Sequence, residues 1–322
     1  MLQAEGASAD PLLAYDRESG KLTGAGIIDR IAVLALQAGS TLTRPFGHRG
    51  YGLGCEAVSA AVSARDIIVR LNPDAVFAMP FADGYWSRLL NSEYDYEEEI
   101  EAFLKSIADV RYVFVDCGAN FGYWSVLVSS KPFGAQTAWA IEASPRNAER
   151  LELNARLNGN RFPCLNAAVG RTSGGYARIT GHKHEALGTV LLADREDDAI
   201  RTVSLDSLGS EGLIDPAQPI VVKLDVEGVD AMRGGASLVS GNTIFICEEH
   251  GSDRDHVVSQ YLMSATPLRV YIFDPQISRF VHVSDAAVLD RVKRYTWVGY
   301  NVFATCNPLW EDRILGTRWH PR

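Results

Sequence analysis

The chain has 322 residues, of which 47% are hydrophobic and 22% charged, and this balance is that of a folded globular protein rather than a disordered one. Its length allows one large domain or two modest ones, with enough residues for a sizeable core. The formal net charge of -9 gives no overall basic face of the kind that binds nucleic acid, so we do not expect DNA or RNA as a partner.

The cysteines and the first residues both favour a cytoplasmic protein. Five cysteines, at positions 55, 117, 164, 247 and 306, are odd in number and show no C-x-x-C spacing. Reduced thiols, most of them buried, are the simplest interpretation. The first 24 residues lack the basic segment and apolar run of a secretory signal, so we expect no signal peptide.

Residues 1–90 are predicted to form an extension of helices and a β-hairpin. Residues 27–38 are apolar at helical spacing but too few to span a bilayer, and a second helix at 55–64 follows a glycine-rich loop at 41–54. The runs IIVRL and AVFAMP are strand-like and flank a turn at 72–74. Two apolar helices are too few to close a core, so we expect this part to serve the substrate side or an oligomer interface.

After an amphipathic helix at 94–107, a strand, a glycine turn and a helix follow one another up to residue 130. The apolar run 113–115 predicts a buried strand, and residues 123–130 are apolar at helical spacing. The order strand, turn, helix places backbone N–H groups in front of a ligand. The turn has the spacing D-x-G-x-N-x-G rather than the G-x-G-x-x-G of dinucleotide folds. Its carboxylate, Asp116, would repel a pyrophosphate and suit an ammonium group, which favours S-adenosylmethionine over NAD.

The next two predicted strands carry polar residues at their ends. The first ends in Glu142, at the position where an acid hydrogen-bonds a ribose diol in folds of this kind. The helix that follows has Ser144 or Asn147 near its N-cap. The second strand ends around Asn166 and Ala167, where a polar side chain can meet the edge of an adenine.

Residues 172–203 interrupt the α/β rhythm with alternating segments that contain glycine. This pattern predicts a hairpin-like insertion near the site. His182 and His184 form an H-x-H pair there, which could chelate a metal only if further ligands converge. Exposed loop histidines are the simpler interpretation.

The last third of the chain supplies the other strands of the sheet. Its predicted strands cover residues 220–228, 243–247, 268–273 and 297–304, and its helices 205–213, 230–240 and 256–265, with a helix or loop at 285–294. Lys223, Asp225 and Glu227 put charges on the first of these strands, where a core strand should be apolar. The second strand ends in the run Glu-Glu-His at 248–250. The last two strands close the sheet as a hairpin-like pair, and residues 308–322 remain as a C-terminal tail.

Together these segments resemble the FkbM-type family of S-adenosylmethionine-dependent methyltransferases. The matching pieces are VFVDCGANFGYWS, IEASPRNAERLELNARLN, AAVG, TVSLDSL, VKLDVEG followed by AMRGG, and ICEEHG. The resemblance covers residues 75–305 and implies a methyltransferase domain at 91–307. It implies an α/β fold of the class I methyltransferase type, a doubly wound, mostly parallel, seven-stranded, Rossmann-like sheet. Tyr96 and Glu97 are similar to a tyrosine–glutamate feature before the family's glycine turn, although an acidic helix start explains the pair equally well.

The resemblance implies S-adenosylmethionine as the cofactor. The residues expected to bind it are those of the glycine turn and of the next two strand ends: Asp116, Gly118, Asn120, Gly122, Glu142, Ser144, Asn166 and Ala167. The best understood members of the family methylate hydroxyls of sugars, polyketides and other small natural products. We therefore expect O-methylation of a small-molecule hydroxyl acceptor in natural product biosynthesis.

The catalytic residues are expected beyond the carboxyl ends of the strands, where open parallel sheets bind their ligands. Lys223 and Asp225 share one face of a strand, as a structural ion pair or as groups that position a hydroxyl. Methyl transfer to an alcohol needs a general base or a metal that eases deprotonation. His250 is the candidate base, while Asp225 and Glu249 resemble the carboxylates that hold Mg2+ in catechol-type O-methyltransferases. We favour the metal-free version because no third ligand is evident. Alternatively, Glu248 and Glu249 only cap the segment that follows them.

Two other functions stay open. The N/D-P-P-Y/F signature of enzymes that methylate planar amino groups is absent, and D-V-E-G stands in its place, which disfavours N-methylation of a small molecule. A non-catalytic S-adenosylmethionine-binding or assembly protein is disfavoured by the carboxylates and the histidine at the strand ends. No motif in the sequence identifies the acceptor. A second copy of the chain is a candidate partner of residues 1–90.

Overall fold

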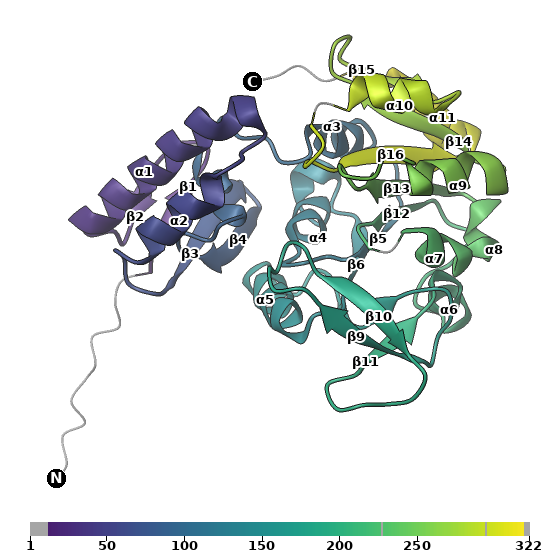
Figure 1. The fold of residues 1–322 in the computed structure, drawn as a ribbon, viewed down its shortest axis with the longest axis horizontal. Helices are drawn as coiled ribbons and strands as arrows, with labels where there is room; N and C mark the ends of the chain where they lie inside the picture. Colours follow the sequence, from purple (N-terminus) through teal and green to yellow (C-terminus); the bar gives the residue numbers. More distant parts are fainter. Residues whose placement is uncertain (1–11, 227, 294, 319–322) are drawn as a thin grey trace. The chain divides into compact units, whose positions relative to one another are not determined.

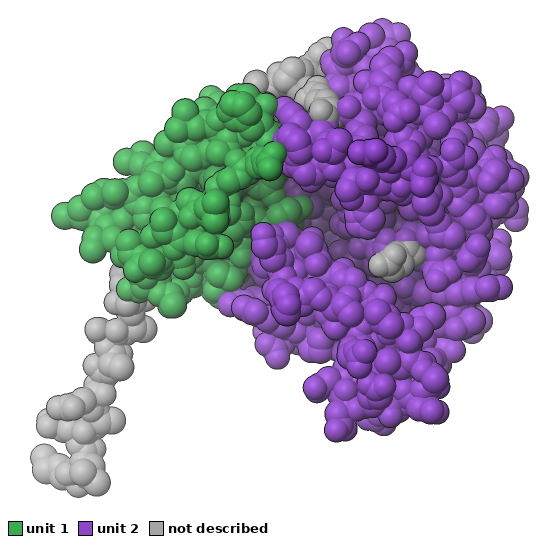
Figure 2. Space-filling view, in the orientation of Figure 1, with its two compact units in different colours: residues 1–95 green, residues 96–322 purple. Residues whose placement is uncertain are grey.

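The structure is a computed structural model that describes residues 12–226, 228–293 and 295–318, and it divides into two compact units. The first unit ends at Asp95 and the second begins at Tyr96, so the boundary falls slightly later than the expected residue 90 (Figure 2). One sheet lies in the first unit and two lie in the second.

The N-terminal unit contains a four-stranded sheet in the order β2-β1-β3-β4 (Figure 1). Its elements are β1 (Ala14–Asp16), β2 (Leu22–Thr23), α1 (Ile27–Thr43), the 3-10 helix η1 (Arg44–Phe46), α2 (Tyr51–Ser59), β3 (Asp66–Asn72), β4 (Ala75–Pro80) and the 3-10 helix η2 (Trp86–Leu90). The expected hairpin of β3 and β4 is present and antiparallel. The expected loop at 41–54 is wrong in part, because α1 and α2 both extend into this glycine-rich segment. Strands β1 and β2 lie where the sequence shows no clear pattern.

Helix α1 combines a capping carboxylate with a buried face. Asp29 accepts a hydrogen bond of 2.7 Å from the N-cap backbone N–H, as the third residue of a capping box does. Leu36 is 2% exposed, on the side of the helix that faces the unit's interior. Ile27, Ile31 and Leu34 are 62–79% exposed, so α1 also presents apolar side chains outward.

The C-terminal unit is built on a sheet that has eight strands in the described part of the chain, in the order β15-β14-β16-β13-β12-β5-β6-β7. These strands are β5 (Val113–Cys117), β6 (Thr137–Glu142), β7 (Cys164–Asn166), β12 (Ile220–Leu224), β13 (Thr243–Glu249), β14 (Arg269–Asp274), β15 (Arg279–His282) and β16 (Tyr300–Thr305). The strands from β13 to β7 pair in parallel, whereas β16 pairs antiparallel with β13 and β14, and β15 pairs antiparallel with β14. The expected seven-stranded, mostly parallel sheet is therefore corrected to eight strands with three antiparallel pairings. The extra strand, β15, is the hairpin partner of β14.

The order of the strands reverses between β5 and β12. From β5 the sheet continues to β6 and β7 on one side, and from β12 it continues to β13 on the other. In doubly wound sheets such a reversal marks the place beyond the carboxyl ends of the strands where ligands bind. Asp116 is paired with Lys223 in the register of β5 and β12, so charged residues from two separate motifs meet at this end of the sheet.

Buried strands and packed helices form the core of this unit. All five residues of β5 and all five of β12 are buried, as expected for strands covered on both faces. The helices are α3 (Glu98–Ser106), α4 (Tyr123–Val128), the 3-10 helix η3 (Lys131–Phe133), α5 (Pro145–Leu157), α6 (Leu205–Ser210), α7 (Gly228–Arg233), α8 (Ala236–Val239), α9 (Val257–Ala265), α10 (Ala286–Val292) and α11 (Pro308–Gly316). Helices α4 and α5 pack on β6, and α9 packs on β13 and β14. Within the described ranges, no helix combines the length and the apolar character needed to cross a membrane.

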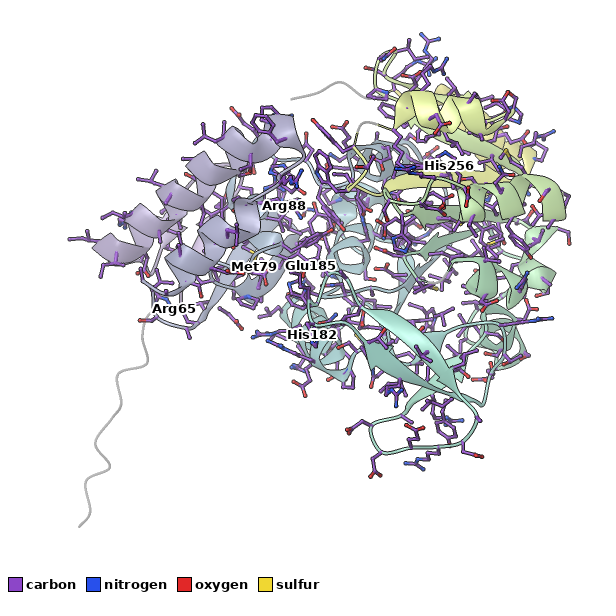
Figure 3. The ribbon with its side chains drawn as sticks, viewed as in Figure 1. Arg65, Met79, Arg88, His182, Glu185 and His256 are labelled. Atoms are coloured by element: carbon purple, nitrogen blue, oxygen red, sulfur yellow. The ribbon has the colours of Figure 1, made fainter. Side chains whose placement is uncertain are left out.

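The predicted insertion at 172–203 forms most of a second, four-stranded sheet in the order β10-β9-β11-β8. Its strands are β8 (Ala168–Val169), β9 (Tyr176–Thr180), β10 (Gly188–Leu192) and β11 (Ile200–Val203). Strands β9 and β10 make an antiparallel hairpin, and the loop that joins them carries His182 and Glu185 (Figure 3). The hairpin-like character of the insertion agrees with its alternating sequence pattern.

The segment 308–322, expected as a tail, contains helix α11. Asn307 caps this helix through its side-chain oxygen. Trp310 and Ile314 are 0% exposed, and the Trp310 ring lies against Phe103 of α3. Residues 308–316 are therefore part of the packed unit, because the apolar face of α11 is buried.

Candidate functional site

The glycine turn after β5 approaches the end of β12 closely. Gly118 has φ +79°, and a Cβ at this position would overlap the backbone oxygen of Asp225 and lie 3.0 Å from its carbonyl carbon. The backbone N–H groups of Gly118 and Ala119 both donate to the carbonyl of Ile141 in β6, at 2.9 and 3.0 Å. Gly122 is the N-cap of α4. The turn is thus fixed between the ends of the two neighbouring strands.

Glu142 lies at the end of β6 and joins two turns. Its Oε2 accepts from the backbone N–H of Asn120 at 2.8 Å, and its Oε1 accepts from that of Ser144 at 2.8 Å. The Ser144 side chain accepts a longer bond of 3.4 Å from the backbone of Asn147 at the start of α5. The side chain of Glu142 is buried, and this burial raises its pKa to about 7 against the two N–H donors.

Asn166 and Ala167, predicted to lie near the adenine, contact the backbone of Glu142. The amide nitrogen of Asn166 donates to the backbone oxygens of Glu142 and Ala143 at 2.8 and 3.0 Å. The backbone N–H of Ala167 donates to the Glu142 oxygen at 3.1 Å. Asn166 is exposed and Ala167 is buried, so the end of β7 offers one polar and one apolar side chain near the backbone of Glu142.

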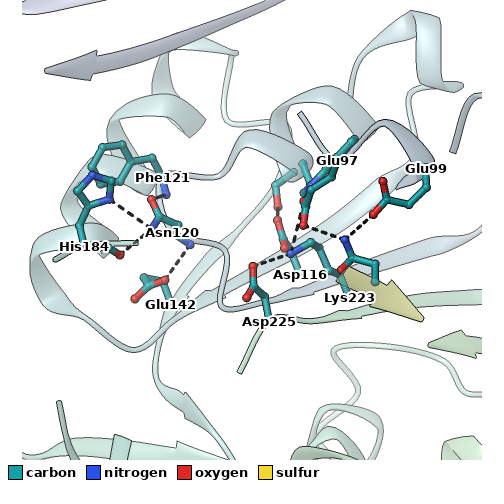
Figure 4. A network of polar contacts seen from close by, with 12 residues as sticks. Glu97, Glu99, Asp116, Asn120, Phe121, Glu142, His184, Lys223 and Asp225 are labelled. Carbon is teal, nitrogen blue, oxygen red and sulfur yellow. Dashed lines mark hydrogen bonds and ion pairs between the residues drawn. The ribbon is translucent and has the colours of Figure 1, made fainter. Parts of the chain in front are cut away.

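The insertion contacts the glycine turn through His184. Its backbone oxygen accepts from the side-chain amides of Asn120 at 2.8 Å and Asn147 at 3.0 Å. Its ring stacks on Phe121, with centroids 4.7 Å apart and planes inclined by 20° (Figure 4). His182, the other histidine of the H-x-H pair, is exposed. The loop therefore fixes the turn mainly through the backbone and ring of His184.

Lys223 and Asp225 form the charged centre of the site. The Lys223 Nζ is 2.8 Å from Asp225 and 3.9 Å from Glu97, and Lys223 is 2% exposed (Figure 4). Burial favours the neutral amine, but the carboxylates of Asp225, Glu97 and Asp116 outweigh it and raise the pKa of Lys223 well above its usual value. Burial likewise opposes ionisation of Asp225, yet Lys223 lowers the pKa of that carboxyl below its ordinary value. Both groups are therefore charged at neutral pH.

Asp116, predicted to bind the cofactor, is enclosed beneath the turn. It is 2% exposed and accepts a bond of 2.7 Å from the Ser125 hydroxyl. Burial raises its pKa to about 6, although Lys223 acts in the opposite direction. The Asp116 carboxyl thus contributes negative charge to the centre from a buried position, and it does not offer an exposed hydrogen-bond acceptor.

The three residues at the end of β13 have different roles. Glu248, and not Glu249, interacts with Asp225, and burial together with the Asp225 charge raises the pKa of Glu248 well above its usual range. Glu249 is 1% exposed, and its oxygens accept from the backbone of Val258 at 3.3 Å and of Ser259 at 2.8 Å at the start of α9. The alternative reading of Glu249, as a helix cap, fits the structure.

His250 is exposed at the end of β13, and its charge, when it is protonated, lowers the pKa of Asp225. Glu227, the other charged residue predicted on this side, lies outside the described residues.

The expected Mg2+ ligand set is not assembled. Asp225 is held by Lys223 and Glu249 by the N-terminus of α9, so the two carboxylates do not face one ion. Among the residues that the structure describes, no group of three or more His, Cys, Asp or Glu side chains could hold a metal. The pair Asp225 and Glu249 therefore does not fit the proposed magnesium site.

Three polar residues of the centre were not predicted as site residues. Glu97 accepts from Trp124 Nε1 at 2.5 Å and from Asn301 Nδ2 at 3.1 Å, and Glu99 accepts from the same Asn301 nitrogen at 2.8 Å. The pair Tyr96-Glu97 gave a signal for the first of them. Asn301 is a polar residue inside the buried strand β16, which is a signal of the same kind as Lys223 in β12.

A comparison with protein families identifies part of the chain. Residues 116–265 match the family model described as the Methyltransferase FkbM domain. The matched segment includes Gly118, Glu142, Lys223, Asp225 and His250. The resemblance to FkbM-type methyltransferases is thus confirmed for this segment. None of the curated proteins matches the chain.

Several solved structures are similar to part of this chain at low sequence identity. A methyltransferase FkbM from Methylobacillus flagellatus KT is 17% identical with a TM-score of 0.39, over 60% of this chain and 43% of its own. M. jannaschii TYW2 in complex with AdoMet is 13% identical with a TM-score of 0.37, over 76% and 85%. An O-methyltransferase from Bacillus cereus in complex with SAH is 14% identical with a TM-score of 0.36, over 66% and 82%. The match spans less than half of the Methylobacillus chain, and at these TM-scores the likenesses carry no functional argument.

Proposed function

Because residues 116–265 form a methyltransferase FkbM domain, we propose that the protein transfers a methyl group from S-adenosylmethionine to a hydroxyl of a small molecule. The observation that carries this proposal is the convergence of Gly118, Glu142 and the Lys223–Asp225 pair at the carboxyl ends of β5, β6 and β12. A sugar, a glycoside or a polyketide would be a suitable acceptor. The net charge of -9 supports a small molecule over a nucleic acid.

The cofactor site would be formed by the glycine turn and the ends of β6 and β7. Each oxygen of Glu142 accepts one backbone N–H, and each keeps a lone pair that could accept a ribose hydroxyl. Asn166 and Ala167 would lie beside the adenine, given their hydrogen bonds to the Glu142 backbone. When bound, S-adenosylmethionine would supply a methyl group on a positively charged sulfur. The carboxylates of Asp116 and Asp225 give this part of the site the complementary charge.

Asp225 and His250 would act on the acceptor hydroxyl in different ways. Lys223 keeps Asp225 ionised, and a carboxylate with a lowered pKa accepts a hydrogen bond well but is a weak base. Asp225 would therefore orient the hydroxyl. An imidazole takes up protons near neutral pH, so His250 would accept the hydroxyl proton as the new bond to the methyl carbon forms. General base catalysis of this kind contributes about 100- to 10,000-fold in rate.

The N-terminal unit would serve the acceptor side or self-association. It contains none of the residues that make up the centre described above, and α1 presents Ile27, Ile31 and Leu34 outward. Apolar side chains exposed together on one helix support contact with a second copy of the chain. Sedimentation analysis of the intact protein tests this role, and a monomer at all concentrations would leave only the acceptor side.

Calorimetry tests the cofactor assignment directly. We expect S-adenosylmethionine and S-adenosylhomocysteine to bind and NAD not to bind. Binding of NAD with no binding of S-adenosylmethionine would end the methyltransferase proposal. The acceptor class is then tested by transfer of a radiolabelled methyl group to a panel of sugars, glycosides and polyketides, with His250→Ala as the inactive control.

A further inference from the structure

A second group of polar side chains lies beside the Lys223–Asp225 pair and is not used in the steps described above. Asn301 of β16 is 5% exposed, and its Nδ2 donates to Glu97 Oε1 at 3.1 Å and to Glu99 Oε1 at 2.8 Å. The two carboxyls stand at the start of α3 and share this one amide nitrogen. We call Glu97, Glu99 and Asn301 the amide–carboxyl group.

Positive charge compensates only one of the two carboxyls in the amide–carboxyl group, because Lys223 pairs with Glu97. Lys223 is 3.9 Å from Glu97, but its shorter contact, 2.8 Å, is with Asp225. For Glu99, the described residues provide no ion pair, and burial together with the Glu97 charge raises the pKa of Glu99 to about 7. Lys223 therefore serves Glu97 and Asp225, and among the described side chains Glu99 has no cation partner. A cation beside Glu99 would be bound favourably.

Asn301 also has an unused acceptor. Its Oδ1 is buried and has no hydrogen-bond partner among the described residues. Buried polar atoms are nearly always paired, so an unpaired one points to a missing partner. Nδ2 of the same amide contacts both carboxyls, and Oδ1 is bonded to the same carbon, so the group offers acceptors from three neighbouring side chains.

An ammonium group matches this arrangement. It carries one positive charge and three N–H donors, which can reach one oxygen from each of Glu97, Glu99 and Asn301. A hydroxyl has one donor and no charge, so it would leave the Glu99 carboxyl without a cation partner. Hydrogen bonds between charged partners are about twice as strong as those between neutral ones.

We propose that Glu97, Glu99 and Asn301 bind a primary ammonium group of the acceptor, which would make the acceptor an amine-bearing alcohol such as an amino sugar or an amino alcohol. This inference rests on the proposed function and names the class of its substrate. An ammonium nitrogen has no free lone pair, so it anchors the acceptor and is not itself methylated. The hydroxyl beside Asp225 and His250 remains the nucleophile.

The test compares two small probes on the full chain saturated with S-adenosylhomocysteine. Ethanolamine and ethylene glycol have the same length and differ in one ammonium group. In calorimetric titrations we expect ethanolamine to bind at least about tenfold more tightly. Equal binding of the two probes to the wild-type protein would overturn the proposal. S-adenosylhomocysteine already occupies the cofactor site in this titration, so its ammonium group does not compete with ethanolamine for the amide–carboxyl group.

Two variants locate the preference. Glu99→Gln keeps an oxygen for the Asn301 amide but removes the charge, and it should abolish the preference for ethanolamine. Glu101→Gln removes a carboxylate from the same helix, where it pairs with Lys105, and should leave the preference intact. A preference that survives in Glu99→Gln, or one that is lost equally in Glu101→Gln, would overturn the assignment. Failure of S-adenosylhomocysteine to bind would instead count against the proposed function.

Discussion

Replacing Gly118 with alanine should destabilise the protein more than the same replacement at Gly159, although both glycines have a left-handed backbone. Their φ angles are +79° and +73°. Left-handed geometry costs an alanine roughly 1–2 kcal/mol relative to glycine at either position. At Gly159 a new Cβ meets no heavy atom of the described residues within 4 Å, so this conformational cost is the whole expected effect.

At Gly118 the new methyl group also meets backbone. It would overlap the carbonyl oxygen of Asp225 and lie 3.0 Å from the carbonyl carbon, where carbon atoms normally keep about 3.5–4.0 Å. The turn after β5 and the end of β12 would have to separate, and such overpacking costs about 1–3 kcal/mol. The expected loss of unfolding free energy for Gly118→Ala is therefore about 2–5 kcal/mol. Typical proteins have about 5–15 kcal/mol in total, so the effect is large.

Urea unfolding of both variants and the wild type, followed by tryptophan fluorescence, measures the difference. The separation of β5 from β12 should also move Asp225, so Gly118→Ala should lose affinity for S-adenosylhomocysteine and lose turnover, while Gly159→Ala keeps both. If the two variants lose the same unfolding free energy, the close approach of the glycine turn to β12 is not a constraint, and the geometry of the site described here is wrong.

Four further predictions concern the site. Glu142→Ala should weaken S-adenosylmethionine binding about 10- to 100-fold, since a charged hydrogen bond contributes about 1.5–3 kcal/mol, and unchanged calorimetric affinity would remove Glu142 from the site. Affinity for the cofactor should rise as the pH increases through about 7, where Glu142 ionises. The unfolding free energy of the ligand-free protein should fall as the pH rises from 4.5 to about 7, because the folded state holds the Glu142 proton more tightly than the unfolded state. Flat pH profiles would contradict both predictions. His250→Ala should lower turnover and leave the melting temperature unchanged, because His250 is exposed. Asp225→Asn should lower turnover and the melting temperature, since it leaves Lys223 without its closest partner. Normal turnover in both variants would make these residues structural. EDTA should leave turnover unchanged, and a loss that Mg2+ restores would show that a metal takes part.

Local patterns predicted the parts of the site that depend on neighbours in the sequence. The buried strand before Asp116, the turn around Gly118 and the acid at the end of β6 each occupy a short segment with a clear pattern. Charged residues in an apolar strand marked Lys223 and Asp225. These elements form as expected because their geometry is fixed within about ten residues.

Contacts between distant segments could not be predicted in this way. Glu99 of α3 and Asn301 of β16 are 202 positions apart, and they meet only when the helix and the strand have packed in the folded unit. The choice between Glu248 and Glu249 depends on the phase of β13, because neighbouring residues in a strand point to opposite faces. A local pattern predicts where the strand ends but not which of its residues face the site. Glu249 was therefore predicted beside Asp225, whereas Glu248 is the residue that interacts with it.

The strand β16 lies between β13 and β14 although it is the last strand along the chain. Until Tyr300–Thr305 has left the ribosome, β13 and β14 each keep one edge with unpaired backbone N–H and carbonyl groups. Such edges pair readily with other chains and promote aggregation. A nascent chain, or one cut by a protease before this strand, should therefore aggregate more readily, because insertion of β16 covers two internal edges and leaves only β15 and β7 at the edges of this sheet.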